Sequence, residues 1–185
     1  VPYIDQRLLR NGMILHAQTK GFFGRAIRWA LKSWGNHDAL LYHEAGSWWV
    51  CDAEPPVARL TPWGEWERRM RRGKCQLRFY WPYGAIQMDG NVAVKWWLAN
   101  VRNAPYDKTA FPRLLWRAVI GPWWKSQAGK DHAWWCTEGV RGAWKFAGFD
   151  VWKHNNSTPL DTEEAVGVGG LDDCTDSVLG LIETN

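Results

Sequence analysis

The stretch His37–Glu54, HDALLYHEAGSWWVCDAE, decides the fold because it holds two β-type segments around a turn. Ala45-Gly46 marks that turn, so we expect a hairpin with a two-residue loop. Continuing the pairing outward from the loop sets His37 opposite Glu54. Directly opposed side chains share a face of the sheet, with Cβ atoms roughly 4.5–5.5 Å apart.

The predicted pair of His37 and Glu54 has a chemical meaning. A carboxylate beside an imidazole fixes its tautomer and stabilises its charged form, which is the orienter and base half of a catalytic triad. Two alternatives stay open. An exposed His–Glu pair would contribute little to stability or function. A slip of one residue in the register would put the two side chains on opposite faces.

Cys136 is the candidate nucleophile, in the stretch HAWWCTEGV that begins at His132. It stands where an apolar-faced helix begins, so unpaired backbone N–H groups would favour a thiolate. A free cysteine is more often only a small buried side chain. Cys51 falls on the other face of the hairpin, Cys75 has no acid–base neighbour, and Cys174 lies in an acidic segment. His132 competes with the hairpin histidine as the base.

Gly139 and Gly142 follow the cysteine by about one and two helical turns. Glycine weakens a helix by roughly 1 kcal/mol relative to alanine, so two of them need a packing reason. We expect this helix to approach a sheet closely and to bring Cys136 to the histidine.

The remaining pattern alternates apolar strands with amphipathic helices. The segment 114–120 is apolar and could be strand or helix, and 60–74 is mixed and charged, with a helical pattern favoured. The other expected elements are strands at 13–16 and 75–81 and helices at 25–32, 91–101 and 136–147, the last capped by Gly148.

The composition excludes several classes of protein. The chain has 185 residues, 46% of them hydrophobic, which suits one globular domain with a sizeable core. It has no apolar run that could span a bilayer, and residues 1–30 lack the pattern of a signal peptide. Four scattered cysteines and five histidines have no CxxC or zinc-finger spacing, so we predict no metal and no cofactor.

Charge is distributed unevenly along the chain. Residues 1–159 carry 23 basic and 12 acidic side chains, a net charge of +11, whereas residues 160–185 carry 7 acids and no base. We therefore predict a catalytic domain over 1–159 and a loosely docked acidic tail over 160–185. The basic run Arg68–Lys74 is either a solvated face or a surface for an anionic polymer such as cell-wall glycan, lipid headgroups or nucleic acid.

Sixteen tryptophans are the outlier of the composition. Most of them are expected in the core, since the successive rings of a doublet point in different directions. Stacking on sugars or nucleobases is the functional alternative. We expect Trp134 and Trp135, directly before Cys136, to wall a substrate groove.

Taken in order, several short motifs resemble those of the circularly permuted NlpC-type papain-like cysteine peptidases. In that family the histidine strand precedes the cysteine helix, and a polar residue on the strand after the histidine completes the triad. Two positions depart from the family pattern: Asp38 replaces a small or apolar residue, and Thr137 replaces the commoner serine. The motifs lie between residues 10 and 150, at Met13-Ile-Leu15, Arg25–Trp29, Asn36–Tyr42, Ala53-Glu54, Tyr106-Asp107 and Trp135–Val140.

The resemblance implies an α+β fold of the permuted papain-like (NlpC) type, with an antiparallel sheet packed against the nucleophile helix. It also implies a Cys136–His37–Glu54 triad that cleaves amide or peptide bonds through a thioester acyl-enzyme. Bacterial cell-wall peptides or glycopeptides would be the substrate. Tyr106 would join the two tryptophans in binding it, in a bacterial envelope or a phage virion.

Two alternative functions remain open at this point. Relatives of the same fold that resemble lecithin retinol acyltransferase act on lipid acyl groups, and aromatic walls with a basic face suit an anionic lipid. A non-catalytic Trp-rich module of a virion or envelope assembly is the second alternative. Nucleic-acid binding ranks last, because the basic residues are dispersed and accompany no known motif.

Overall fold

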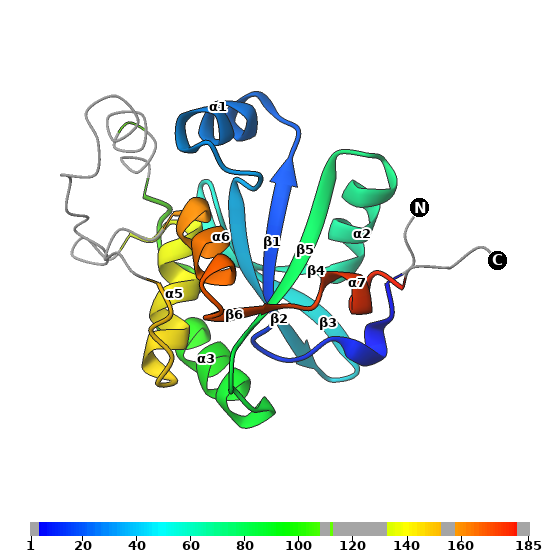
Figure 1. The fold of residues 1–185 in the computed structure, drawn as a ribbon, viewed down its shortest axis with the longest axis vertical. Helices are drawn as coiled ribbons and strands as arrows, with labels where there is room; N and C mark the ends of the chain where they lie inside the picture. The colour runs from blue at the N-terminus through cyan, green and yellow to red at the C-terminus, as the bar shows by residue number, and fades with distance from the viewer. Residues whose placement is uncertain (1–3, 108–111, 113–132, 153–157, 181–185) are drawn as a thin grey trace.

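The structure, a computed structural model, describes residues 4–107, 112, 133–152 and 158–180. Its centre is a six-stranded antiparallel sheet in the order β4-β3-β2-β1-β5-β6, surrounded by helices (Figure 1). The fold is therefore α+β, as predicted. The strands are β1 (Ile14–Thr19), β2 (His37–Glu44), β3 (Ser47–Glu54), β4 (Val57–Pro62), β5 (Cys75–Pro82) and β6 (Leu171–Asp173). The helices are η1 (Gln6–Leu8), α1 (Phe22–Leu31), α2 (Trp63–Arg71), α3 (Gln87–Asn100), α5 (Cys136–Phe146), α6 (Pro159–Gly167) and α7 (Thr175–Val178).

The hairpin of β2 and β3 has the predicted register. Glu44 pairs with Ser47, and the ladder continues inward to Leu40 opposite Cys51. Ala45, at φ 51°, and its glycine neighbour both adopt the left-handed conformation that a tight two-residue turn requires. Local turn chemistry was therefore enough to fix which side chains share a face of this hairpin.

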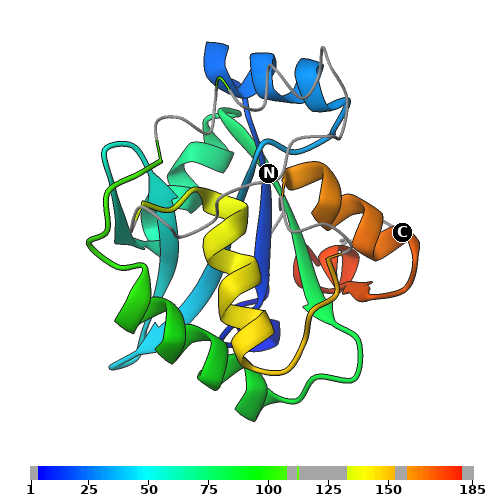
Figure 2. The ribbon, with the colours of Figure 1, turned by 90° about the vertical axis from the view of Figure 1, so that its left-hand side faces the viewer.

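Helices α3 and α5 pack against each other and cross the sheet (Figure 2). A Cβ atom added at Gly139 would lie 3.0 Å from Trp97 Nε1, and one added at Gly142 would lie 2.6 Å from the Trp96 ring. The two glycines do serve close packing, as expected. The surface that they meet is the pair of tryptophans on α3 rather than the sheet.

The segment expected to be helical over 60–74 is a strand followed by a helix. β4 extends the hairpin by pairing with β3, and α2 begins at Trp63, immediately after Pro62. Trp66 on α2 has 0% of its surface exposed, so this otherwise charged helix packs on the core through a buried tryptophan. The apolar segment 114–120 lies outside the described residues.

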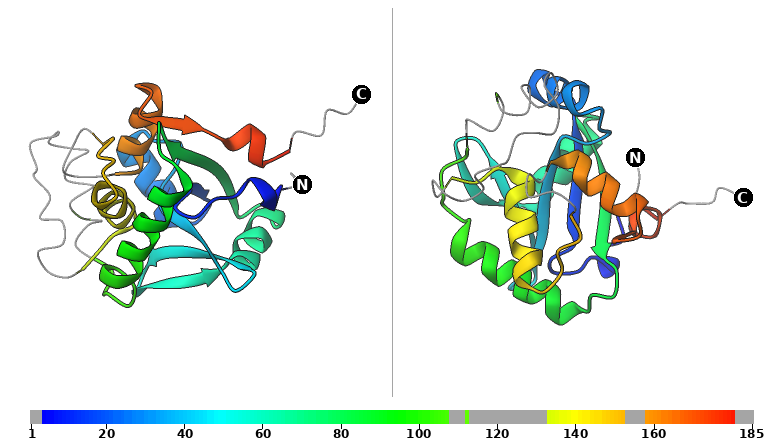
Figure 3. Two further views of the ribbon diagram at one scale, coloured as in Figure 1. Left: turned by 90° about the horizontal axis from the view of Figure 1, so that it is seen from below. Right: turned by 60° about the vertical axis from the view of Figure 1, so that its left-hand side comes forward.

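The described part of the acidic segment, residues 160–180, is part of the fold and not loosely docked (Figure 3). β6 adds a sixth strand beside β5, with Leu171 opposite Pro82. Thr158 caps α6 by accepting a hydrogen bond from the Asp161 amide. Leu171 and Val178 are buried, so isolated apolar residues among the acids anchor the segment to the sheet.

Large rings fill much of the core, as the sequence suggested. Trp97 and Trp144 are fully buried, and the Trp144 indole donates a hydrogen bond to the Gly12 carbonyl at 3.0 Å. Trp29 on α1 is the contrary case, with 77% of its surface exposed. In the parts of the chain that the structure describes, no helix is both long and apolar enough to cross a membrane.

Candidate active site

The hairpin places a histidine beside a carboxylate in the interior. His37 begins β2, and its Nε2 donates to Asp52 Oδ1 on β3 at 2.8 Å. The other oxygen of Asp52 accepts a hydrogen bond from Thr61 Oγ1 at 3.4 Å. His37 and Asp52 are both buried, so the bond is shielded from water.

The bonding partner of His37 differs from the predicted Glu54. Asp52 and Glu54 are two residues apart on β3, so their side chains lie on the same face of the sheet. Asp52, which is diagonal to His37 in the expected register, makes the hydrogen bond. Glu54 instead accepts from both terminal nitrogens of Arg69 on α2, at 3.1 and 3.3 Å. Glu54 remains close by, because one donor atom from each of His37, Asp52 and Glu54 lies within 4.8 Å of the others.

Helix α2 supplies two residues to the site: Trp66, which the sequence did not single out, and Arg69, which was expected only as part of the basic run Arg68–Lys74. The Trp66 ring stacks on the His37 ring, with centroids 5.8 Å apart and planes inclined by 14°. The Arg69 guanidinium lies over the Trp66 ring, 4.8 Å from its centroid. A fully buried indole on the imidazole fixes the ring plane and favours its cationic form.

Cys136 is the first residue of α5, as predicted, and it is buried. Trp135 precedes it in an extended conformation, and no side chain caps the helix. The first-turn N–H groups of an α-helix have no partner within the helix, so they can stabilise negative charge.

His37 interacts with Asp52 and Cys136 at the same time. Burial alone would lower the pKa of His37. The Asp52 carboxylate and its hydrogen bond to the ring, together with the charge of Cys136, outweigh burial and raise that pKa well above 6.5. Since Nε2 is bonded to Asp52, Nδ1 is the ring nitrogen available to the thiol. The order Asp52, His37, Cys136 is the one that an orienting residue, a base and a nucleophile would need.

The other cysteines have environments that suppress the thiolate. Cys51 and Cys75 are buried, and burial raises the pKa of both thiols, that of Cys75 to about 11. Cys174 is partly exposed, and burial raises its pKa as well. All four cysteines are free thiols. His132, the competing base, lies outside the described residues.

The three aromatic residues expected to bind substrate have different surroundings. Tyr106 is near the nucleophile, since burial and then the Cys136 charge raise its pKa. Trp134 forms a β-bridge with Tyr106 and packs edge-on against Trp96, with centroids 5.6 Å apart. Trp135 is buried against Leu31, so it belongs to the packing between α5 and α1 and not to an open wall.

A second buried histidine lies nearby, and it accounts for both departures from the family pattern. His16 Nδ1 lies 2.6 Å from Asp38 Oδ1, and His16 Nε2 lies 3.1 Å from Glu163 Oε1 on α6. Asp38 Oδ2 accepts from Thr137 Oγ1 at 2.6 Å and from Thr162 Oγ1 at 3.0 Å. The two unusual residues, Asp38 and Thr137, are thus bonded to each other.

The charge of His16 in this second cluster is stabilised by two carboxylates. Burial opposes a charged His16, but the Asp38 and Glu163 carboxylates raise the pKa of His16 to about 9. Glu163 also accepts hydrogen bonds from Ser33 Oγ and from the Gly35 amide. Together with the His16 bond these outweigh burial and lower the pKa of Glu163 to about 2. The cluster is an ion-paired network inside the fold.

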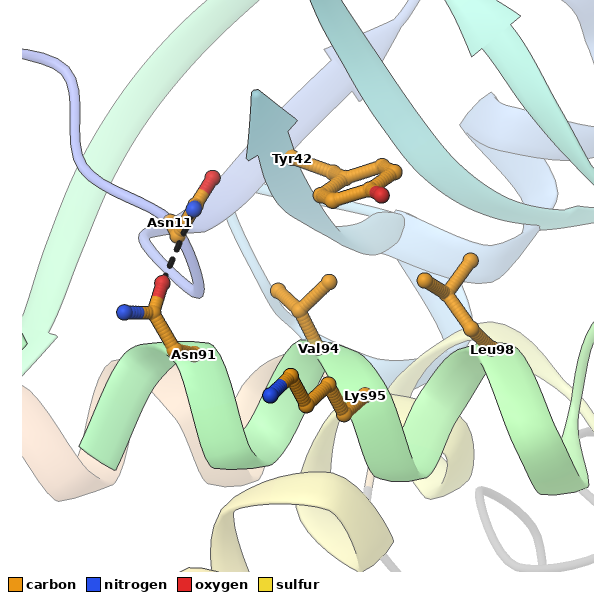
Figure 4. Close-up of a pocket in the computed structure, with 6 residues that line it drawn as sticks. All are labelled: Asn11, Tyr42, Asn91, Val94, Lys95 and Leu98. Carbon is orange, nitrogen blue, oxygen red and sulfur yellow. Dashed lines mark hydrogen bonds between the residues drawn. The ribbon is translucent and has the colours of Figure 1, made fainter. Parts of the chain in front are cut away.

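A separate hollow of about 150 Å³ lies between β2 and α3 (Figure 4). None of the six predicted site residues lines it. Its walls are Asn11, Tyr42, Asn91, Val94, Lys95 and Leu98.

The comparisons with known proteins address the fold. The chain is similar to a solved structure described as the metalloprotein yiiX from Escherichia coli O157:H7, DUF1105, with a TM-score of 0.59 and 17% identity. The match covers 92% of this chain and 91% of that one. No protein-family model matches the chain, and no curated protein matches it. At this identity the likeness extends to the architecture of the whole chain and no further.

Proposed function

We propose that this protein is a cysteine hydrolase that cleaves amide bonds through a Cys136–His37–Asp52 triad. The observation that carries the proposal is the position of His37, which is bonded to Asp52 and lies close enough to Cys136, at the start of α5, for the charge of Cys136 to raise its pKa. Asp52 replaces Glu54 as the orienting residue. The order of the motifs, which resembles that of the permuted papain-like peptidases, supports the same reading.

In the proposed reaction, His37 takes the Cys136 proton and the thiolate attacks the amide carbonyl carbon. The resulting oxyanion is stabilised by uncapped N–H groups at the start of α5. The imidazolium gives its proton to the leaving amine, the C–N bond breaks and a thioester remains. His37 then deprotonates a water molecule, which attacks the thioester and releases the acid and the thiol. Asp52 holds the ring in one orientation throughout.

Peptide bonds of bacterial cell-wall peptides are the proposed substrate class. The family resemblance supports this choice, and the half-buried Tyr106 beside Cys136 offers a hydroxyl and a ring face for a peptide chain. Acyl bonds of lipids are the competing substrates of the same chemistry.

The test compares Cys136→Ala with Cys174→Ala, a matched change at a partly exposed cysteine. Both variants and the parent are incubated with muropeptides and, separately, with phospholipid vesicles, and products are identified by mass spectrometry. We expect new amine and carboxyl ends from muropeptides with the parent and Cys174→Ala, and none with Cys136→Ala. If products formed only from phospholipids, the substrate would be a lipid and not a cell-wall peptide. Full activity of Cys136→Ala would contradict the proposed mechanism.

A second candidate function is metal binding by His37, Asp52 and Glu54. Imidazole nitrogen and carboxylate oxygen are donors that Zn²⁺ accepts, and a bound Zn²⁺ ion would supply Lewis-acid chemistry. The description of the similar fold as a metalloprotein also favours it. Two contacts compete with an ion: the bond from His37 to Asp52 and the ion pair of Glu54 with Arg69.

Metal content after dialysis against zinc separates the two candidates. A metal site predicts about one bound Zn²⁺ per chain, lost in Glu54→Gln and retained in the control Glu65→Gln. A triad predicts no retained metal in either variant and hydrolysis that survives chelation.

A further inference from the structure

Helix α1 carries an outward face that the proposed site does not use. Phe22 and Trp29 have 74% and 77% of their surfaces exposed. They are seven residues apart, so they lie on one side of the helix, two turns from each other. Arg25 is exposed on the same side, three residues from Phe22, and Lys32 is exposed directly after the helix ends at Leu31. Aromatic rings and cations therefore alternate along one stripe, which we call the α1 stripe.

Positive charge predominates around the α1 stripe. From Lys20 to His37 the sequence contains four Lys and Arg residues and no acid, and the nearby Glu163, which bonds Ser33 and Gly35, is itself paired with His16. Arg28 is used inside the fold, where its guanidinium donates to Asn36 Oδ1 at 3.2 Å. Arg25 and Lys32 have no ion-pair partner among the described residues, which leaves both cations for an external anion.

The opposite side of α1 is anchored to the body of the protein. Leu31 is buried against Trp135, and Ile27 packs on the same cluster. Gly24 lies so close to β1 that an added Cβ would meet the Thr19 carbonyl at 2.6 Å. Helix α1 lies at one end of the molecule, as Figures 1 and 2 show. Because its other side is anchored, its exposed rings are held on the outside.

We infer that the α1 stripe docks the protein on an anionic phospholipid surface. Phe22 and Trp29 enter the boundary between headgroups and acyl chains, and Arg25 and Lys32 pair with lipid phosphates. Rings that repeat along a convex helix face suit a flat apolar boundary, and the absence of acids from residues 20–37 complements a negative surface. Because Leu31 packs on Trp135, docking holds the Cys136 end of α5 beside the bilayer.

The test is sedimentation of the full chain with vesicles of phosphatidylcholine, with or without phosphatidylglycerol. We expect at least about tenfold tighter binding to the anionic vesicles, weakened by salt. The double variant Phe22→Ser/Trp29→Ser should lose about tenfold or more, and Arg25→Gln/Lys32→Gln should lose the preference for phosphatidylglycerol. Tyr83→Ser, which removes another ring with 70% of its surface exposed, is the matched control and should bind like the parent.

Folding of each variant is checked by its melting temperature. Equal binding to both vesicles, unchanged binding of the ring variant, or equal loss in Tyr83→Ser would each overturn the inference. Binding to isolated cell-wall glycan in place of vesicles would also overturn it and would assign the stripe to a polymer.

Discussion

Two buried His–Asp pairs on neighbouring strands differ in what faces the second ring nitrogen. His16 on β1 is bonded to Asp38 and, through its other nitrogen, to Glu163. His37 on β2 is bonded to Asp52, and its other nitrogen is left for Cys136. A histidine held by two carboxylates is fixed as a cation. A histidine held by one carboxylate and a thiol can exchange a proton.

The two pairs are also neighbours in sequence. His37 precedes Asp38 on β2, and Cys136 precedes Thr137 on α5. The 2.6 Å bond from Thr137 to Asp38 therefore fixes the start of α5 against the strand that carries the base. The ion-paired network therefore supports the position of Cys136, on which the proposed reaction with His37 depends.

The largest expected difference between the two pairs is in catalytic rate, when His37 or His16 is replaced by glutamine. His37→Gln should lower amide hydrolysis per folded molecule by on the order of 10³-fold, because it removes the base. It should also lower the melting temperature, because Asp52 is left buried without its cationic partner. Assays of hydrolysis and of thermal unfolding on the same preparation check this. A His37→Gln protein with half the parent rate would contradict the assignment of the base.

His16→Gln should lower stability and leave catalysis nearly intact. Removing the cation leaves Asp38 buried, and Glu163 partly buried, without their partner, so we expect a loss of about 3 kcal/mol in the free energy of unfolding. Urea denaturation measures this loss. Activity per folded molecule should stay within about threefold of the parent, since His16 does not contact Cys136. Unchanged stability would show that the network is dispensable.

Asp52→Asn and Glu54→Gln compare the two carboxylates on one face of β3. We expect Asp52→Asn to reduce kcat by about 10²-fold, because an amide stabilises the imidazolium less than a carboxylate does. Glu54→Gln should cost less than about threefold, since its partner is Arg69. Steady-state kinetics measure kcat for both variants. A larger loss of kcat in Glu54→Gln than in Asp52→Asn would show that Glu54, and not Asp52, orients His37.

The smallest expected effect is on stability against pH. The pKa of His16 is about 9 in the folded protein and close to 6.5 when unfolded, so its contribution is complete below pH 6.5. It is lost as pH rises through 9, and we expect the melting temperature to fall by roughly 5 °C over that range. Asp38→Asn should flatten the slope, and the control His43→Gln should not. An equally steep slope in Asp38→Asn would assign the pH dependence to other groups.

Two features of the candidate site could be predicted from local sequence: the hairpin register and the start of the helix that carries Cys136. The turn at Ala45-Gly46 set the register, and the apolar periodicity after Trp135 located the helix start at Cys136. Both features depend on residues within a few positions of each other. They could therefore be predicted without knowledge of the tertiary fold.

The choice between Asp52 and Glu54 could not be predicted in this way. Both lie on one face of β3, and Arg69, which arrives from α2, decides the matter by pairing with Glu54. The acidic segment was misjudged for a similar reason. Its pairing with β5 is long-range, and its two anchors, Leu171 and Val178, are single apolar residues among acids.

The most direct test of the account is the rate of Cys136 alkylation by iodoacetamide as a function of pH. Peptide mapping reads Cys136 and Cys174 separately, so the second thiol serves as an internal reference. An ion pair with His37 predicts that Cys136 still reacts at pH 6, about tenfold or more faster than Cys174, and that His37→Gln abolishes the advantage. The account would be contradicted if the alkylation rates of Cys136 and Cys174 decreased in parallel as the pH is lowered, both in the parent and in His37→Gln.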